Sequence, residues 1–429
     1  MSLNPMQVDL SARTLENAVD AVVPELSVVI PCLNEAETIH ACIDTVQRVF
    51  RELAISGEII VADNGSVDGS PDIASRMGAR VIRVKNKGYG NALQSGIGIA
   101  RGRYVITGDA DGSHDFGQIP EFLAKLREGY DVVIGNRFHG KIHAGAMPPL
   151  HRYVGTPLLT QLGKLLFHSP CGDQQCGFRG FSRKAFSRMS LRAPGMEFAS
   201  EMVLKAACLR LRIAELPTTH FPSGRRGPRH LRTWRDGWRH LRLMLLHSPR
   251  WLFFYPGLTL VVAGMGTGAW LLPGPKIFRG ITFDIHTLLY AGTAVLLGFQ
   301  ALTFAAFSKL YAIREGLLPD DTRIEQLLRA VSLEVGLVVG GVLAALGLAL
   351  SIYALGRYSA AHFGTLDPVK TMRLVIPAAV SLALGGQTVL SSFLLSLLLL
   401  PPMPERWVAK ELPHDDLEHE IAPSVSTAD

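Results

Sequence analysis

The chain has 429 residues and a formal net charge of +6, with 48 % hydrophobic and 19 % charged residues. An average soluble domain carries about 25 % charged residues, so this composition excludes a disordered or collagen-like chain and argues against a wholly soluble protein. Five cysteines without a Cys-x-x-Cys pair exclude a disulfide scaffold and a zinc ribbon, and predict reduced thiols that face the cytosol.

Residues 1–25 contain no long apolar run, so they predict a flexible N-terminal arm rather than a secretory signal peptide. Residues 26–227 alternate short β-branched runs with amphipathic stretches, which is typical of an α/β domain with a mostly parallel sheet and helices on both faces. The expected strands are Leu26–Pro31, Glu58–Ala62, Arg80–Val84, Tyr104–Gly108 and Asp131–Gly135. The expected helices are Glu35–Leu53, Gly69–Met77, Gly88–Ala100 and Gln118–Glu128.

Residues 228–250 predict an amphipathic helix in the membrane interface, because large apolar residues recur there in steps of three and four among arginines. These residues are Leu231, Trp234, Trp238 and Leu241. A nucleic-acid-binding patch is the alternative for so many arginines, but the charge-free segment that follows favours the membrane. Residues 148–167 show similar spacing and predict either a second interfacial or acceptor-cleft helix or an ordinary core helix.

Residues 251–404 predict a transmembrane domain, because four of their segments exceed the ~20 residues that a helix needs to cross a bilayer. The predicted spans are 251–272, 285–307, 335–356 and 374–400. Basic residues concentrate before the first span, where 225–250 holds eight arginines and one aspartate, and in the loop 308–333. The positive-inside rule then places the α/β domain and both termini in the cytoplasm. The polar tail, 405–429, is expected to be disordered.

The strongest local signal is the segment RYVITGDADGSHDF, residues 103–116, in which Asp109 and Asp111 follow an apolar strand. They therefore lie at the carboxyl edge of the sheet, where open α/β folds bind ligands. Two carboxylates this close repel each other unless a cation lies between them or one is protonated. Oxygen ligands select Mg²⁺ or Mn²⁺, and such an ion is normally shared with substrate phosphates.

Three other loops bring polar residues and helix N-termini to the same edge. They are PCLNE at 31–35, DNGS at 63–66 and KGYGN at 87–91. A diphosphate or a nucleoside would be held there. The sequence contains neither a Gly-x-Gly-x-x-Gly motif after the first strand nor a P-loop, so a dinucleotide cofactor and a P-loop NTPase are both disfavoured.

The motifs SVVIPCLNEAETI, ADNGSVDGS, DAD and DQQCGFRGF, spread over residues 26–250, resemble those of family 2 glycosyltransferases. Within that family they look most like the dolichol- or polyprenyl-phosphate sugar synthases, which transfer mannose or glucose onto a lipid phosphate. The resemblance implies the nucleotide-diphospho-sugar transferase (GT-A) fold, with Asp63 at the nucleoside and Asp109 and Asp111 around a metal and the donor diphosphate. The implied donor-binding residues are Pro31, Asn34, Glu35, Asp63, Gly65, Ser66, Lys87, Asn91 and Asp109.

Two departures from the family pattern lie on the donor side. Asn64 replaces the more usual second aspartate, which leaves the base preference open. Ser113 stands where several relatives place a glutamine near the metal, so the metal-ligand candidates are Asp109, Asp111 and Ser113. The DQQCGF motif is closer to the glucose-transferring relatives, which favours UDP-glucose over GDP-mannose as the donor.

The resemblance places Arg137 and the segment with Asp173, Cys176 and Arg179 on the acceptor side. A lipid phosphate is already ionised near neutral pH because its second pKa is about 6, so it needs positioning and cationic neutralisation more than a general base. Arginine supplies both. The acceptor-phosphate candidates are Arg137, Arg179, Arg225, Arg226 and Arg229, and the catalytic candidates are Asp111, Asp173 and Arg137, with Asp111 or Asp173 as any base.

The sequence therefore predicts a metal-dependent inverting glycosyltransferase that moves a hexose from a nucleotide diphosphate sugar to a polyprenyl phosphate. A processive polysaccharide synthase is the nearer alternative, but the Gln-x-x-Arg-Trp signature of such enzymes is missing from the sequence. A glycolipid transporter with a nucleotide-binding domain is the other, and the near absence of charges within the predicted spans disfavours it. Four histidines without ligand spacing are expected to be structural or surface residues. They are His114, His143, His151 and His220.

Overall fold

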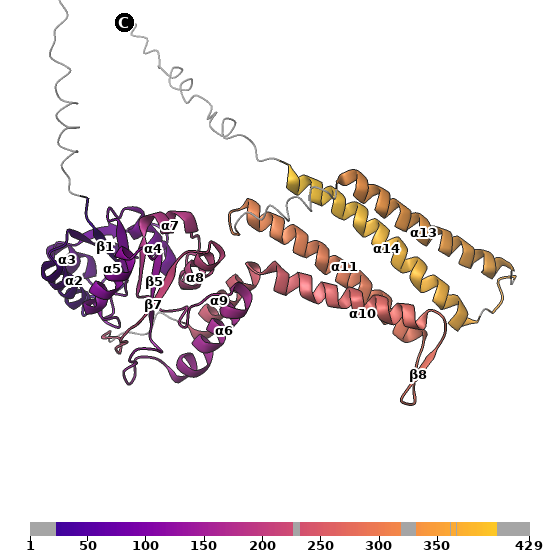
Figure 1. Cartoon of the computed structure of the whole chain (residues 1–429), viewed down its shortest axis with the longest axis horizontal. Helices are drawn as coiled ribbons and strands as arrows, with labels where there is room; N and C mark the ends of the chain where they lie inside the picture. Colours follow the sequence, from indigo (N-terminus) through magenta and orange to yellow (C-terminus); the bar gives the residue numbers. More distant parts are fainter. Residues whose placement is uncertain (1–22, 226–231, 319–331, 361, 366, 401–429) are drawn as a thin grey trace, which may run out of the picture. The chain divides into compact units, whose positions relative to one another are not determined.

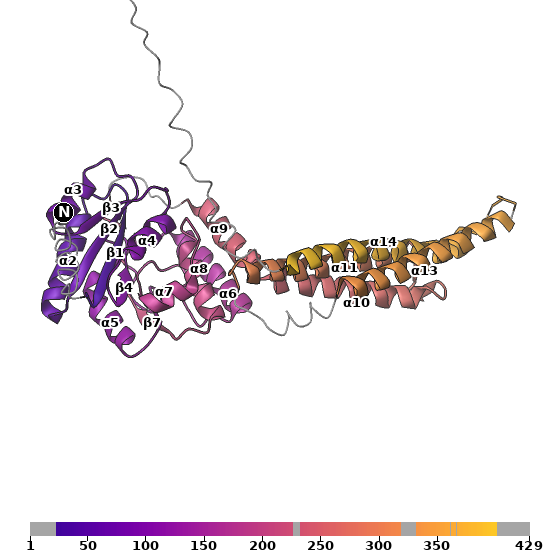
Figure 2. The ribbon, with the colours of Figure 1, turned by 90° about the horizontal axis from the view of Figure 1, so that it is seen from above.

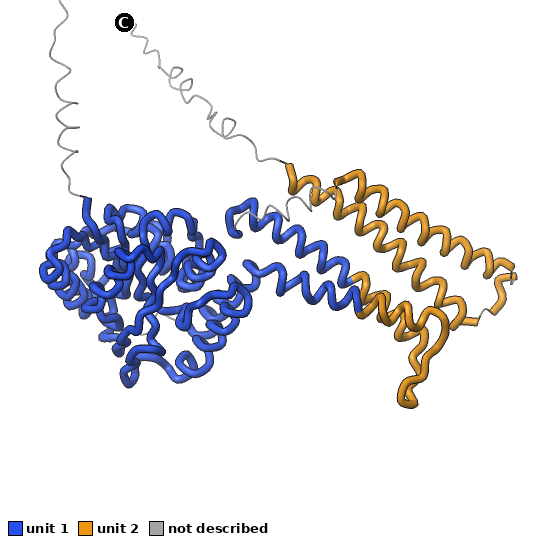
Figure 3. The backbone as a smooth tube through the Cα atoms, viewed as in Figure 1, with its two compact units in different colours: residues 1–262, 297–321 blue, residues 263–296, 322–429 orange. Residues whose placement is uncertain are grey.

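The computed structural model describes residues 23–225, 232–318, 332–360, 362–365 and 367–400. The predicted C-terminal tail and nearly all of the predicted N-terminal arm lie outside these residues. The chain divides into two compact units, residues 1–262 with 297–321 and residues 263–296 with 322–429 (Figure 3).

The first unit is built around a sheet that includes β1, β5 and β7 (Figure 1). This sheet has seven strands in the order β3-β2-β1-β4-β6-β5-β7. Its strands are β1 (Leu26–Cys32), β2 (Gly57–Asp63), β3 (Arg80–Arg83), β4 (Tyr104–Thr107), β5 (Val132–Asn136), β6 (Arg179–Ser182) and β7 (Ile213–Pro217). Only β6 runs antiparallel to its neighbours, β4 and β5, so the sheet is mostly parallel, as the sequence predicts. The sequence prediction did not include β6 and β7.

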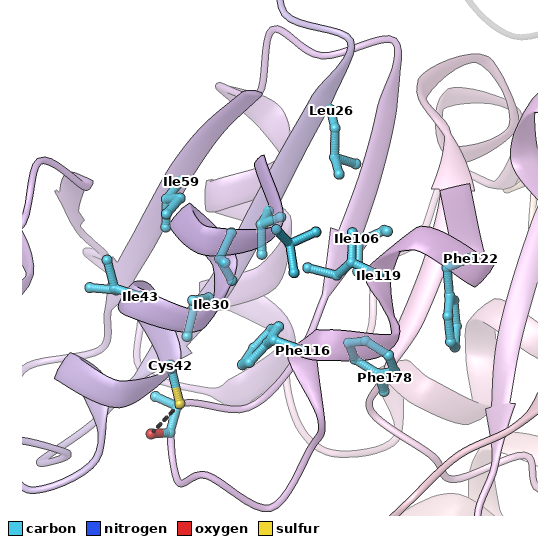
Figure 4. Close-up of a cluster of buried hydrophobic side chains, with 14 of the residues drawn as sticks. Leu26, Ile30, Cys42, Ile43, Ile59, Ile106, Phe116, Ile119, Phe122 and Phe178 are labelled. Carbon is cyan, nitrogen blue, oxygen red and sulfur yellow. Dashed lines mark hydrogen bonds between the residues drawn. The ribbon is translucent and has the colours of Figure 1, made fainter. Parts of the chain in front are cut away.

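Side chains of β1 alternate between two cores, one on each face of the sheet. Leu26, Val28 and Ile30 pack with helices α2 (Ile39–Leu53), α3 (Ser70–Arg76) and α5 (Ile119–Arg127), and Figure 4 shows part of this cluster with Phe116 and Phe178. Val29 packs with α4 (Tyr89–Gly98), α7 (Arg183–Met189) and α8 (Phe198–Cys208). Figure 2 shows α2 and α4 on opposite sides of β1. Parallel strands buried on both faces stabilise the edge from which the site loops emerge.

Two helices of this unit carry exposed apolar side chains. The wide helical turn η2 (His151–Gly155) continues into α6 (Thr156–Phe167), whose outward side chains are Tyr153, Val154, Leu158 and Leu165, at 70, 52, 65 and 54 % exposure. Its buried face consists of small residues, Thr156, Thr160 and Gly163. The apolar stripe therefore faces outward, and the prediction that this segment could be an ordinary core helix is wrong.

Helix α9 (Thr233–Leu246) also exposes large apolar side chains while its buried face includes polar ones. It buries Asp236, His240 and Met244, whereas Trp234 is 84 % and Trp238 is 59 % exposed. Leu231, which the sequence places on the apolar face, lies outside the described residues. A surface that presents tryptophan beside arginine is typical of a helix that lies in a membrane interface.

Four helical segments in the described part of the chain are long and apolar enough to cross a membrane. They are Arg250–Leu271, Ile285–Arg314, Leu333–Ala360 and Pro368–Leu399. The corresponding helices are α10 (Tyr255–Leu271, after the wide turn η3, Arg250–Phe254), α11 (Ile285–Arg314), α13 (Leu333–Ala360) and α14 (Pro368–Leu399), and β8 (Lys276–Phe278) and β9 (Ile281–Phe283) form a hairpin between the first two. Four spans agree with the sequence prediction.

Close glycine contacts and one ion pair hold the second unit together. A Cβ on Gly340 of α13 would lie 2.9 Å from the Gly385 carbonyl oxygen of α14, so these helices approach as small residues allow in membranes. Near the start of α14, Arg373 donates to Asp284, the residue before α11, and to the Leu271 carbonyl at the end of α10. This arginine therefore ties three of the spans.

Candidate active site

Asp109 lies at the centre of a hydrogen-bonded group directly after β4. Its Oδ1 accepts from the Tyr89 hydroxyl at 2.9 Å, and its Oδ2 lies 3.1 Å from Nε2 of His114. Burial raises the pKa of this carboxyl, but the bonds from His114 and Tyr89 outweigh burial and hold the pKa below its usual range. Asp109 is therefore a fixed anion at the carboxyl edge.

Gly177 brings the DQQCGF segment directly against this group. A Cβ on Gly177 would lie 3.0 Å from Asp109 Oδ2, 3.1 Å from the Tyr89 hydroxyl and 3.2 Å from His114 Nε2. The Thr107 hydroxyl donates to the Gly177 carbonyl at 3.1 Å, which fixes the approach. The DQQCGF segment leads directly into β6, and the antiparallel pairing of β6 with β4 brings Gly177 beside the end of β4.

Asp111 is half-buried, and its Oδ1 accepts from the Ser113 amide at 3.0 Å. The segment 220–225, which we call the strap, runs alongside this loop. The Phe221 amide donates to the Ser113 carbonyl at 2.9 Å, and the Gly224 amide donates to the Asp111 carbonyl at 2.9 Å. The strap therefore fixes the backbone of two of the three predicted metal ligands, Asp111 and Ser113. Ser113 itself is buried and takes part through these backbone bonds.

The strap ends in an ion pair with the loop after β1. Arg225 donates from Nε to Glu35 Oε2 at 3.3 Å and from Nη2 to Glu35 Oε1. Glu35 is 5 % exposed, and burial raises its pKa to about 6 even though Arg225 favours the ionised form. Two predicted residues from opposite ends of the domain are thus in contact. Arg226 and Arg229 lie outside the described residues.

The donor-side loops interlock at the ends of β1 and β2, which are level because Cys32 pairs with Asp63. Asp63 is buried, and its Oδ1 accepts from the Ser66 amide at 2.9 Å. The Ser66 hydroxyl in turn accepts from the Asn34 amide at 2.9 Å. Asn34 at φ 57° and Gly65 at φ 99° adopt the left-handed turns that these close loops require. Pro31 lies within β1, one residue before the edge.

The N-terminus of α4 joins this group. Asn64 Oδ1 accepts from the Gly88 amide at 3.1 Å. Asn64, which stands where the family more usually has an aspartate, therefore still provides a side-chain oxygen that bonds the loop after β2 to the start of α4. Lys87 is exposed, and its Cε would lie 3.8 Å from a Cβ on Gly65. The Asn91 side chain donates to the Lys87 carbonyl at 3.1 Å and caps this turn. The structure thus brings the predicted donor-side residues together at one edge.

Arg137 and Asp173 form a bidentate ion pair on the other side of β4. Nε and Nη2 of Arg137 donate to the two carboxylate oxygens of Asp173 at 2.6 and 2.9 Å. Burial raises the pKa of Asp173, but the Arg137 charge outweighs burial and lowers it. The Asp173 side chain is fully buried. A carboxylate held in this way is a poor proton acceptor, so the geometry favours a role in orienting Arg137 over that of a base.

Glu215 on β7 is a site residue that the sequence analysis missed. Its Oε1 accepts from the Gly172 amide and, at 3.2 Å, from the Asp173 amide. Its Oε2 lies 3.3 Å from the side-chain nitrogen of Asn136, which donates to it. Glu215 therefore holds the loop that presents Asp173 to Arg137. The only sequence signal was an acidic residue in a short apolar run, which is a weak one.

Arg179 is 2 % exposed, and its guanidinium donates to the carbonyls of Cys176, Gln174 and Ala199. Burial lowers its pKa. A side chain engaged by three backbone carbonyls inside the domain supports the DQQCGF segment and has no route to a phosphate. The prediction that Arg179 binds the acceptor phosphate is therefore wrong, because its guanidinium is occupied by these backbone carbonyls.

His114 and His220 also belong to the site, although neither has ligand spacing in the sequence. His114 contacts Asp109 as described, and its ring lies 5.6 Å from that of His220, between centroids. His220 is 8 % exposed, and burial lowers its pKa to about 4. The proximity of His114 to the aspartate pair in the sequence was the signal that could have identified it.

The donor set fits a divalent ion that a substrate completes. No three His, Cys, Asp or Glu side chains of the described ranges form a group that could hold a metal by themselves. Mg²⁺ is often bound by one or two carboxylates together with substrate phosphates, and Asp111 Oδ2 makes no hydrogen bond within the described part of the chain. Asp111 would hold such an ion, with the Asp109 charge beside it.

Two family models match the chain. Residues 27–190 match glycosyl transferase family 2, and residues 306–399 match the glycosyltransferase family 2 C-terminal transmembrane region.

The chain also resembles characterised and solved proteins. The low-salt glycan biosynthesis hexosyltransferase Agl6 of Haloferax volcanii is 38 % identical over 377 residues, covering 87 % of this chain and 89 % of that protein. The dolichyl-phosphate hexose transferase of the same organism is 31 % identical over 195 residues, covering 45 % of this chain and 81 % of that protein. A crystal structure of glucosyl-3-phosphoglycerate synthase from Mycobacterium tuberculosis with Mn²⁺, UDP-glucose and phosphoglyceric acid has a TM-score of 0.41 and 24 % identity, covering 52 % of this chain and 79 % of that one.

Proposed function

The chain belongs to glycosyltransferase family 2 and is a membrane glycosyltransferase, and from this premise we propose that it moves a hexose from a nucleotide diphosphate sugar to a polyprenyl phosphate. The observation that carries the proposal is the meeting of donor-side loops, two aspartates and two carboxylate-held arginines at one sheet edge. The dolichyl-phosphate hexose transferase among its relatives supports a lipid phosphate as the acceptor. The closeness of DQQCGF to glucose-transferring enzymes favours UDP-glucose over GDP-mannose.

In this proposal an oxygen of the lipid phosphate attacks the anomeric carbon of the donor sugar. The new bond joins that oxygen to the carbon, the bond to the β-phosphate oxygen breaks, and the nucleoside diphosphate leaves with the electron pair. Direct displacement inverts the anomeric configuration. A phosphate monoester is ionised at neutral pH, so the reaction needs no side chain to remove a proton. This agrees with the position of Asp173, whose two carboxylate oxygens both accept hydrogen bonds from Arg137.

Charge neutralisation is then the main task of the protein. A Mg²⁺ or Mn²⁺ ion, when bound, would supply Lewis-acid stabilisation of the leaving diphosphate. Asp111 would hold this ion, while Asp109 is kept ionised and oriented by His114 and Tyr89. Arg137, held by Asp173, presents a fixed cation to the acceptor phosphate. Asp63 and the two loops that carry Asn34 and Ser66 would bind the nucleoside.

The exposed apolar faces of η2, α6 and α9 support a catalytic domain that rests on the bilayer surface. Arginines beside exposed tryptophans would contact anionic lipid headgroups from the cytoplasm. We place the α/β domain and both termini there because the basic residues flank the spans on that side. A polyprenyl phosphate, anchored by its tail, would then offer its phosphate at the depth of these helices.

The test incubates the purified full chain in liposomes with a panel of radiolabelled UDP- and GDP-sugars, polyprenyl phosphate and Mg²⁺ or Mn²⁺. We expect one donor to label a product that is extracted into organic solvent and released by mild acid, as a glycosyl phosphate is. Liposomes without the lipid phosphate and the Asp111→Asn variant are the controls. Label in a water-soluble polymer would support a processive synthase instead, and no transfer from any donor would refute the proposal.

A further inference from the structure

Two arginines near the aspartate pair are held in the same manner. Arg137 and Arg225 each donate from Nε and Nη2 to one buried carboxylate, Asp173 and Glu35 respectively. The arginine side chains are 12 and 16 % exposed. In both cases Nη1 makes no hydrogen bond to the residues that the structure describes. A planar guanidinium fixed along one edge leaves its other donors to meet an anion in a defined orientation.

The sheet order places these two arginines on opposite sides of β4, whose end carries the aspartates. Glu35 follows β1, which lies between β4 and β2. Arg137 follows β5, which lies beyond β6 on the other side of β4. The nucleoside-side loops, with Asp63 and Lys87, all belong to the β1–β3 half. The Arg225 cation is therefore on the donor half, although it follows β7, the last strand of the sheet in chain order.

We propose that Glu35 is a positioning residue that holds Arg225 beside Asp111 as a ligand of the donor diphosphate, which leaves Arg137 to bind the acceptor phosphate. This assignment rests on the proposed function and replaces the expectation that Arg225 binds the acceptor. The strap supports it, because the Gly224 amide bonds the Asp111 carbonyl at 2.9 Å, so the neighbouring Arg225 cannot move far from the aspartate loop while the strap is seated.

The close fit of the strap explains the position further. A Cβ on Gly224 would lie 2.8 Å from Thr38 Cγ2 and 3.7 Å from the Asp111 carbonyl oxygen, so the strap is pressed between the start of α2 and the aspartate loop. Without Glu35, the Arg225 side chain would have rotamers to explore at this position, and ordering it on a ligand would cost free energy. Glu35 provides this order before the donor arrives.

The experiment measures binding of UDP and GDP to the full chain in nanodiscs, with Mg²⁺ and again with EDTA. We expect Arg225→Ala to weaken binding of the preferred nucleotide about tenfold or more in both conditions, as the loss of a charge-assisted hydrogen bond would. Glu35→Gln should weaken it at least about threefold, and Glu35→Asp, which keeps the charge, less than that. The double variant should be no worse than Arg225→Ala alone, because Glu35 acts through Arg225.

The matched controls are Glu52→Gln and Arg48→Ala, which break an exposed Arg–Glu pair on the same helix, α2. They should leave nucleotide affinity unchanged. In steady-state assays, Arg225→Ala should raise the KM for the donor and leave the KM for the lipid phosphate unchanged. Arg137→Lys should do the reverse. Amide hydrogen exchange at Phe221 and Gly224 shows whether the strap of each variant is still seated.

Wild-type nucleotide affinity in an Arg225→Ala variant whose strap is seated would overturn the assignment, as would a selective rise in the acceptor KM. Additive effects of Glu35→Gln and Arg225→Ala would refute the positioning role of Glu35. A failure of the proposed function looks different, because no donor would then be transferred while the nucleotide-binding comparison could still be made.

Discussion

Gly177→Ala tests whether the DQQCGF segment shapes the Asp109 group. The added Cβ would lie 3.0 to 3.2 Å from three polar atoms, Asp109 Oδ2, the Tyr89 hydroxyl and His114 Nε2. These separations are a few tenths of an ångström below ordinary van der Waals contact. Asp109 is bonded to both Tyr89 and His114, so moving any of the three away from the methyl group strains at least one of these bonds. Gly177 does not have a positive φ, so alanine fits its backbone and only this contact changes.

The expected cost to folding is modest, because overpacking by one methyl group destabilises by about 1–3 kcal/mol. The effect on catalysis should be larger in relative terms. Displacement of a catalytic group by about 1 Å can cost about 10²-fold in rate, and a shift of a few tenths should cost on the order of tenfold. We therefore expect kcat to fall about tenfold while the melting temperature falls by a few degrees.

The assay is sugar transfer to polyprenyl phosphate by the full chain in liposomes, with thermal unfolding measured on the same preparation. Gly98→Ala is the matched control, because a Cβ at the C-terminal end of α4 would meet nothing within 4 Å. That variant should retain wild-type activity and be equally or slightly more stable. Wild-type kcat for Gly177→Ala would refute the reasoning, since it would show that the contact does not constrain the Asp109 group.

Four other predictions use the same assays. Asp111→Asn should abolish both transfer and Mn²⁺ binding with little change in melting temperature, whereas Asp109→Asn should also lower the melting temperature because it weakens the bonds to His114 and Tyr89; full turnover of the double variant in EDTA would contradict a metal-dependent mechanism. Asp173→Asn leaves the buried Arg137 charge unpaired and should destabilise by about 3–5 kcal/mol, so an unchanged melting temperature with abolished kcat would instead indicate a base. Burial lowers the pKa of His220 and of His240 to about 4, whereas a histidine of the unfolded chain has a pKa of 6.5, so the unfolded state binds more protons between these values. The free energy of unfolding should therefore be highest above pH 6.5 and decline towards pH 4. If His220→Asn and His240→Asn leave this decline unchanged, the two histidines are not its cause. In a variant without native cysteines, a cysteine at Lys276 should react with an impermeant reagent outside intact cells and one at Glu315 only after lysis, and the reverse pattern would contradict the proposed orientation.

The α/β domain and the four spans could be predicted because their signals are local. Alternating β-branched runs, helical spacing and long apolar segments each lie within one element. Strands β6 and β7 were missed for the same reason. The sequence of β6 is only RGFS, and β7 reads IAELP, so neither contains a run of β-branched residues. Their place in the sheet depends on pairing with β4 and β5.

The site was predicted loop by loop, and the contacts between loops were not. Asp109, Asp111 and the donor-side loops follow from strand ends and turn residues. The ion pair of Glu35 with Arg225 joins residues 190 positions apart, and no periodicity connects them. The fate of Arg179 depended on which carbonyls the fold would place around it, which the residue type cannot tell. Charged residues of one motif can therefore have unrelated tasks, as Arg179 and Asp173 do.

The strap has a consequence for how this enzyme can be divided. Its residues come after the last strand of the sheet and immediately before the segment that leads to α9. A shortened protein that ends at Pro217 would retain every strand of the seven-stranded sheet, yet it would lack Phe221, Gly224 and Arg225. The backbone carbonyls of Asp111 and Ser113 would then lose the amide donors that the strap provides. The seven-stranded sheet and its helices alone would thus not contain the whole candidate site, because Arg225 and the hydrogen bonds to Asp111 and Ser113 come from the strap that follows the last strand.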